Sequence, residues 1–212
     1  WKNQNLSEKD ILRWIADEVN VARLWADFHN IPWHVVPRKR APSTLYMLMF
    51  HPERKKVYFA FPMTHAFDDG ISYDAQTNLA LKLVKYCALT DPRGIESNKI
   101  PLEDRCLALA TFYRDLNLWV TQNQMIFVFY ATPVPSIGAA SEVLQARFQT
   151  KDVYIVWPEE RMSFFTIAAA NRIFKAEKEF LDYFVEKYDL NNKEIIIPEK
   201  IVNDAYSKEK DL

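Results

Sequence analysis

Cysteine and glycine are both scarce in this chain of 212 residues. It contains two cysteines, Cys87 and Cys106, and three glycines. Two cysteines cannot build a disulfide framework, and no C-x-x-C spacing is present to hold zinc. The pair fits a reduced setting, so we expect a cytoplasmic protein. The chain is instead rich in apolar residues, since 49% of its residues are hydrophobic and 14% are aromatic. This composition is typical of a globular protein with a real core and not of a disordered one.

The chain also lacks an excess of charge and a long apolar run. Its net charge is −1 and its basic residues are scattered, which argues against a nucleic-acid or anionic membrane surface. The absence of an 18-residue apolar run and of a signal peptide argues against a membrane protein. No cluster of metal-ligating residues is visible, so we expect neither a metal nor another cofactor. Because the first residue is Trp1 and not Met, we expect a processed or truncated chain or a piece of a longer protein.

Helical and strand patterns alternate along most of the chain. A capped amphipathic helix is predicted over 8–29. The later predicted strands are 57–61, 125–130 and 153–157. The later predicted helices are 71–88, 103–122 and 138–149, and a helix-rich segment is predicted over about 164–188. This alternation predicts a three-layer α/β fold with a mostly parallel, flavodoxin-like or Rossmann-like sheet and an N-terminal helical extension. We expect an N-terminal helix and linker over 1–42, the α/β domain over 43–190 and a charged tail over 191–212.

The loops after two predicted strands lie where parallel sheets bind ligands, beyond the carboxyl ends of the strands. One of them, T-P-V-P-S-I-G-A-A-S-E-V over 132–143, leads into a helix. Ser136 can cap this helix or bind a phosphate oxygen, and Gly138 lets backbone approach a ligand closely. Glu142 lies about one turn further on. The alternative is an ordinary capped turn, in which Glu142 is an acid favoured by the helix dipole.

Four pieces of the chain, in order, resemble one enzyme superfamily. These are K-K-V-Y-F-A-F-P-M-T (55–64), R-D-L-N-L-W-V (114–120), P-S-I-G-A-A-S-E-V-L-Q-A (135–146) and K-D-V-Y-I-V (151–156). Together they are similar to motifs of the nucleoside 2-deoxyribosyltransferase-like superfamily. The third piece resembles the P-S-x-G-x-x-x-E-x-x-x-A motif of its nucleoside 5′-monophosphate N-hydrolase branch.

The resemblance implies roles for five residues. Glu142 would be the nucleophile that forms a glycosyl-enzyme ester, as suits an oxocarbenium-like transition state. Asp115 would orient the sugar or protonate the leaving base. Ser136 and Gly138 would hold the 5′-phosphate, and Tyr58 would lie near the substrate. The implied activity is an N-glycosidase or glycosyltransferase acting on a nucleoside or nucleoside 5′-monophosphate, and the resemblance also implies a homo-oligomer.

Departures from the family pattern leave other interpretations open. Phe61 stands where the family has glycine, which would crowd the pocket and favour a catalytically inactive nucleotide-binding sensor on the same scaffold. H-A-F-D-D-G over 65–70 also fits the H-x-x-x-D-G motif of acyltransferases, in which His65 would be a general base. Otherwise His65 and Asp69 border the substrate or belong to a solvated loop. Arg93 is expected at the surface, with phosphate binding as the alternative, and His34 is expected to pack or to face water.

Overall fold

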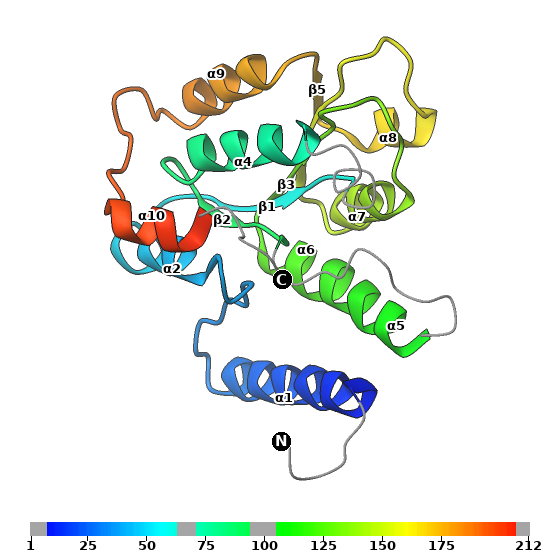
Figure 1. Cartoon of the computed structure of the whole chain (residues 1–212), viewed down its shortest axis with the longest axis vertical. Coiled ribbons are helices and arrows are strands. Elements are labelled where there is room, and N and C mark those ends of the chain that lie inside the picture. Colours follow the sequence, from blue (N-terminus) through cyan, green and yellow to red (C-terminus); the bar gives the residue numbers. More distant parts are fainter. Residues whose placement is uncertain (1–7, 63–70, 94–104, 207–212) are drawn as a thin grey trace.

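A five-stranded, entirely parallel sheet forms the centre of the protein (Figure 1). The computed structural model of the chain describes residues 8–62, 71–93 and 105–206. The strands are β1 (Lys56–Ala60), β2 (Ala88–Thr90), β3 (Met125–Phe129), β4 (Asp152–Val156) and β5 (Arg172–Phe174), in the order β2-β1-β3-β4-β5. In this doubly wound order the chain changes direction between β1 and β3. Ligands bind at such a switch point, outside the carboxyl ends of the strands. The predicted α/β class and parallel sheet are therefore confirmed.

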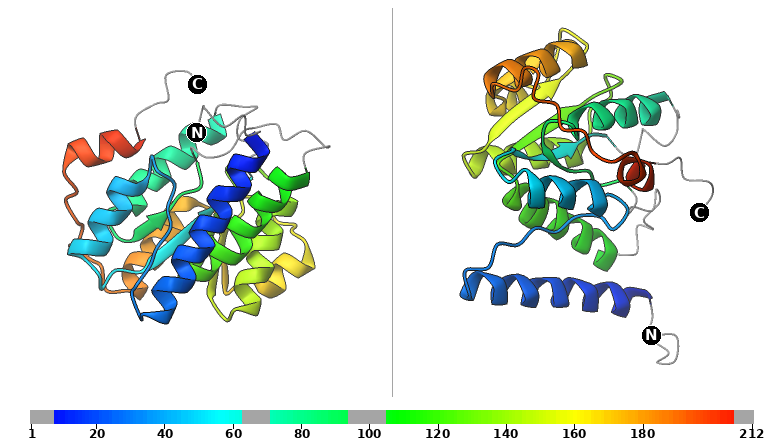
Figure 2. Two further views of the ribbon diagram at one scale, coloured as in Figure 1. Left: turned by 90° about the horizontal axis from the view of Figure 1, so that it is seen from below. Right: turned by 90° about the vertical axis from the view of Figure 1, so that its left-hand side faces the viewer.

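Helices cover both faces of the sheet and make it the middle of three layers (Figures 1 and 2). The longer helices that follow the strands are α4 (Ile71–Leu83), α7 (Ile137–Phe148) and α9 (Glu177–Lys187). Shorter helical segments are α5 (Arg105–Tyr113), η1 (Arg114–Trp119), α6 (Val120–Gln122) and α8 (Phe164–Ala169). The N-terminal helix α1 (Glu8–Phe28) lies outside these layers, next to α5, as Figure 2 shows.

Two apolar clusters hold the layers together, one on each face of the sheet. They arise because successive residues of a strand point to opposite faces. Phe59 of β1, Phe127 of β3 and Phe180 of α9 belong to one cluster, and the last two rings stack with centroids 3.7 Å apart. Tyr58 of β1 and Val143 of α7 belong to the other. Strands buried on both faces read as continuous apolar runs, which explains M-I-F-V-F in β3.

The structure contains four elements that the sequence patterns do not predict. The stretch 44–50, too short to classify from sequence, lies in helix α2 (Ala41–Phe50). Strands β2 and β5 have three residues each, too few to show a period. β2 begins at the last residue of the helix predicted over 71–88, and β5 interrupts the helix-rich segment predicted over 164–188. The stretch expected as a charged tail contains α10 (Glu199–Tyr206), whose Ala205 and Tyr206 are buried in the core. This segment therefore packs on the domain through α2 and α4.

The linker between α1 and α2 is tied to the end of β2 and to α6 by hydrogen bonds. His34 Nε2 lies 3.1 Å from Thr90 Oγ1 at the end of β2, and the Val35 N–H donates to Gln122 Oε1 at 2.8 Å. Burial, with a smaller contribution from Lys56, lowers the pKa of His34 to about 4. Of the two expectations for His34, packing against the protein is the one that the structure shows.

Candidate functional site

Glu142 lies at the switch point of the sheet, in hydrogen-bond contact with β1. Prolines in the loop before α7 prevent an earlier helix start, and Ser136 caps the helix, its Oγ accepting from the Ala139 N–H at 3.4 Å. Glu142 is one turn further on and only 7% exposed. Its Oε1 accepts a hydrogen bond of 2.6 Å from the Tyr58 hydroxyl. The structure thus brings together two residues that are 84 positions apart in sequence, both of which the resemblance places at the substrate.

A second phenol lies close to the same carboxylate. Tyr130 follows β3 directly, and burial together with the negative charge of Glu142 raises its pKa to about 12. Its ring meets that of Trp157, which follows β4, edge to face with centroids 4.8 Å apart. The sequence patterns predict no role for Tyr130. The available signal was an aromatic residue at the carboxyl end of a central strand, next to the candidate loop.

Asp115 lies in a wider helical turn that precedes β3. The Val120 N–H donates to the Asp115 carbonyl five residues back, so η1 is a π-helix, a form frequent at functional sites. Asp115 Oδ1 accepts a 2.9 Å hydrogen bond from Arg114 Nε. Burial raises the pKa of Asp115, and the attraction of Arg114 offsets only part of this effect.

A chain of side chains leads from Asp115 toward Glu142. The Arg114 guanidinium lies over the Trp119 ring at 4.4 Å, and the Trp119 ring lies 5.9 Å from that of Tyr58. Tyr58 in turn contacts Glu142. The Trp119 indole is buried, and within the described part of the chain its Nε1 has no hydrogen-bond partner. The two predicted acids therefore share one face of the sheet and are linked through an arginine and two aromatic rings.

Gly138 has room for a side chain in the fold itself. A Cβ at this position would meet only Ser136 Oγ, at an ordinary contact distance of 3.7 Å. The backbone of Gly138 is not in the left-handed region that favours glycine. Packing and backbone geometry therefore give no reason for glycine here, whereas close approach of a ligand would.

Phe61 packs on the opposite face of the sheet from Glu142. It is three residues after Tyr58, so its side chain points to the other side of the strand. There it meets Phe59, with ring centroids 5.2 Å apart, and the Arg93 guanidinium at 5.6 Å. The sequence suggests that Phe61 would crowd the substrate pocket. Its side chain, however, lies on the opposite side of β1 from the contact between Tyr58 and Glu142.

Arg93 is buried, contrary to the surface position expected from the sequence. Its Nη2 donates to Asp91 Oδ2 at 2.5 Å and its Nη1 to Thr77 Oγ1 at 2.6 Å. Burial alone would raise the pKa of Asp91, but Arg93 and then Arg40 lower it. These contacts fix the chain just after β2, so Arg93 supports the carboxyl edge of the sheet from within. Among the other predicted site residues, His65 and Asp69 lie outside the described residues.

A cavity of about 500 Å³ opens beside the start of α7. Ser136, Ile137 and Leu144 line one side, and residues of α8 and of the loop before it line the other. Tyr130 and Trp157 contribute aromatic walls from the ends of β3 and β4. Of the predicted site residues, Ser136 borders this hollow, together with Tyr130, whereas Glu142 and Gly138 do not line it. Its volume lies in the range of small-molecule sites.

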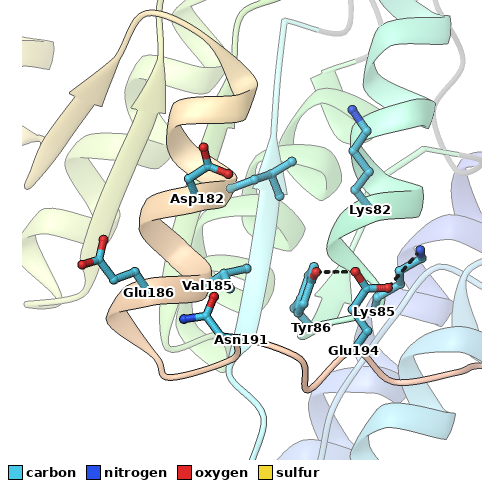
Figure 3. Close-up of a pocket in the computed structure, with 9 residues that line it drawn as sticks. Lys82, Lys85, Tyr86, Asp182, Val185, Glu186, Asn191 and Glu194 are labelled. Atoms are coloured by element: carbon cyan, nitrogen blue, oxygen red, sulfur yellow. Dashed lines mark hydrogen bonds and ion pairs between the residues drawn. The ribbon is translucent and has the colours of Figure 1, made fainter.

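A second hollow, of about 640 Å³, lies between α4 and α9 (Figure 3). It is lined by Lys82, Lys85 and Tyr86 near the end of α4, and by residues of α9 and the segment after it. Because α4 runs back from the carboxyl edge, its end is at the amino edge of the sheet. Lys85 and Tyr86 both bind Glu194, and Lys82 binds Glu177 at 2.6 Å. These lysines are paired within the protein, so we do not place the site here.

None of the helices that the structure describes is both long and apolar enough to cross a bilayer. Over the same part of the chain, no three or more histidine, cysteine or acidic side chains are grouped so that they could hold a metal ion. Cys87 is buried, and burial raises the pKa of its thiol. A buried thiol of raised pKa is a poor nucleophile.

Comparisons with known proteins add little to this geometry. The chain matches no known protein-family profile, and it matches no curated protein. Among solved structures it is similar to a conserved protein from Enterococcus faecalis V583, with 17% sequence identity and a TM-score of 0.47. That similarity covers 63% of this chain and 99% of the other. It carries no argument about function.

Proposed function

We propose that the protein is an N-glycosidase or glycosyltransferase that cleaves the N-glycosidic bond of a nucleoside or nucleoside 5′-monophosphate. The observation that carries this proposal is the 2.6 Å hydrogen bond between Tyr58 and Glu142 at the switch point of the sheet. This bond orients a buried carboxylate near the switch point, and its position supports the proposal because ligands of doubly wound folds bind outside the strand ends at such points. The motif resemblance independently selects the same two residues.

In the proposed reaction a Glu142 oxygen attacks the anomeric carbon of the sugar. The C–N bond breaks, and its electron pair leaves with the base. A buried carboxylate stabilises the positive charge that develops on the sugar and then forms the glycosyl ester. Tyr58 keeps the nucleophile oriented by donating its hydroxyl hydrogen. Attack by water, or by a second base, on the anomeric carbon then releases Glu142.

Asp115 is the proposed donor of the proton that the leaving base takes up. A general acid must hold a proton near neutral pH, and the burial that raises the pKa of Asp115 favours its protonated form. Its partner Arg114 acts in the opposite direction, so this role depends on how the contact between Arg114 and Asp115 changes when substrate binds. Ser136 and the first N–H groups of α7 are the proposed site for a 5′-phosphate.

Release of free base from a panel of nucleosides and their 5′-monophosphates, followed by chromatography, tests the proposal. We expect release by the wild-type protein and none by Glu142→Gln. Glu160→Gln changes an exposed acid of the neighbouring loop in the same way and should keep full activity. Acid quenching during turnover should give intact protein heavier by one sugar residue with a nucleoside, or by one sugar phosphate with a 5′-monophosphate, and this adduct should be absent from Glu142→Gln.

Two results would contradict the proposal. If nucleotides bind but no base is released from any of them, the protein is a binding module and not an enzyme. If base release survives Glu142→Gln, another residue is the nucleophile, and the hydrogen bond to Tyr58 has only a structural role.

A further inference from the structure

Helix α1 carries a row of apolar side chains on the side that faces away from the protein. Val21, Leu24, Trp25 and Phe28 are 65%, 60%, 58% and 81% exposed. Residues three and four apart share one face of a helix, so these four form a continuous stripe, here called the α1 stripe. Figure 2 shows α1 at the edge of the molecule, with one side toward α5 and the other turned outward. The α1 stripe therefore has no covering within the described part of the chain.

The opposite face of α1 accounts for its attachment to the protein. Ala26 is buried, and Val19 packs against the apolar cluster that contains Tyr58. Arg23 lies over the Trp33 ring at 5.9 Å, and Trp33 Nε1 donates to Asp27 Oδ1 at 2.6 Å. Since these contacts already anchor the helix, the α1 stripe is not needed to hold α1 in place. Large exposed apolar residues that are not needed to hold a helix in place mark a surface for association.

The spacing of the α1 stripe is symmetrical about its centre. Read in either direction, the positions 21, 24, 25 and 28 have the same separations. A second copy of α1, packed antiparallel about a two-fold axis at the midpoint, therefore places Val21 opposite the partner's Phe28. Leu24 and Trp25 lie at the axis, where each meets the same residues of the partner. A self-complementary patch of this kind is what a two-fold homodimer requires.

Polar and charged groups beside the α1 stripe favour the antiparallel arrangement. Glu18 and His29 lie on the same flank, at opposite ends of the stripe. The His29 N–H donates to the Trp25 carbonyl, which continues the helix, and its ring lies against those of Trp25 and Phe28 at 4.5 and 5.0 Å. Antiparallel packing brings Glu18 beside the partner's His29, twice by symmetry. Parallel packing would instead bring the exposed Asp17 beside its own copy, an unfavourable contact of like charges.

We propose that the α1 stripe is the contact surface for a second copy of this chain, bound antiparallel about a two-fold axis. This proposal does not depend on the proposed enzyme function, because it involves none of the site residues. One helix from each copy buries less than the ~1,200–2,000 Å² of a standard interface. We therefore expect a weak dimer whose population rises with concentration.

Sedimentation over a wide range of concentrations tests the surface. The wild-type chain should pass from monomer to dimer. Leu24→Lys, which brings two lysines together at the axis, should remain monomeric at every concentration. Met49→Lys is the matched control, since Met49 is 71% exposed on α2, and it should dimerise like the wild type. Circular dichroism should show equal helix content in all three. A chain that is always monomeric, or a dimer that survives Leu24→Lys, overturns the proposal.

Disulfide trapping tests the arrangement of the two helices without disturbing the fold. In a Cys106→Ser background, with Cys87 buried, a mixture of Val21→Cys and Phe28→Cys chains should form a covalent dimer on mild oxidation. Each variant alone should not, because its sulfurs would be at opposite ends of the stripe, beyond disulfide reach. Cross-linking of Val21→Cys with itself would show parallel packing and overturn the antiparallel arrangement.

Discussion

Replacing Tyr58 by Phe removes one hydroxyl group and tests the contact on which the candidate site depends. The Tyr58 hydroxyl donates to Glu142 Oε1 over 2.6 Å, the short distance typical of a hydrogen bond to a charged acceptor. Such bonds contribute about 1.5–3 kcal/mol, and the variant leaves a buried carboxylate with one donor fewer. We therefore expect the free energy of unfolding to fall by this amount. For a domain of this size the melting temperature should fall by about 3–12 °C.

Urea unfolding at neutral pH measures the effect, with Tyr113→Phe as the matched control. Tyr113 is exposed on α5, so its hydroxyl should contribute almost nothing. A double-mutant cycle with Glu142→Gln then isolates the pair, because the two substitutions together should cost less than the sum of each alone. A loss in Tyr58→Phe no larger than that in Tyr113→Phe, or a cycle without coupling, would refute the hydrogen bond as a stabilising contact.

The remaining predictions concern three other positions. Gly138→Ala should keep the free energy of unfolding or raise it by up to about 1 kcal/mol. The same variant should bind a 5′-monophosphate more weakly in calorimetry, and unchanged binding would contradict a close approach of the ligand to the backbone. The pKa of His34 is lowered to about 4, so its contribution to stability should be complete above pH 6.5 and should be lost as the pH falls toward 4. Urea titrations should show a loss of at most about 3 kcal/mol over this range, and His34→Gln should flatten the dependence on pH. Arg93→Met should lower stability by about 3–5 kcal/mol by leaving Asp91 buried without its main partner, and Asp91→Asn in the same chain should recover part of this loss.

The sequence was most informative where apolar patterns were long. The predicted helix over 8–29 agrees with α1, and the predicted strands at 57–61, 125–130 and 153–157 agree with β1, β3 and β4 to within one residue at either end. Strands β2 and β5 were missed because three residues cannot show a period, and because their place at the sheet edges is decided by tertiary pairing with β1 and β4. The parallel class did not require them, since helices already separated the longer strands.

The candidate site was predictable only in part. The Ser136 cap and the position of Glu142 one turn into α7 followed from local spacing, which helix geometry fixes. The contact between Tyr58 and Glu142 and the closeness of Tyr130 depend on how β1, β3 and α7 pack, so the sequence alone could not give them. The orientation of Phe61 was predictable in principle. It is an odd number of residues after Tyr58 in a strand, which places the two side chains on opposite faces.

Both edges of the sheet are short, and this determines how copies of the chain can meet. β5 has three residues, and the β2 edge is covered by α2, whose Thr44 hydroxyl donates to the Leu89 carbonyl at 2.6 Å. A long open edge would offer backbone groups to another chain and would invite indefinite strand addition. In the described part of the chain, little backbone is therefore left to pair at either edge of the sheet. The proposed antiparallel contact through the α1 stripe would close on itself about its two-fold axis, so crowding would produce discrete pairs and not fibres.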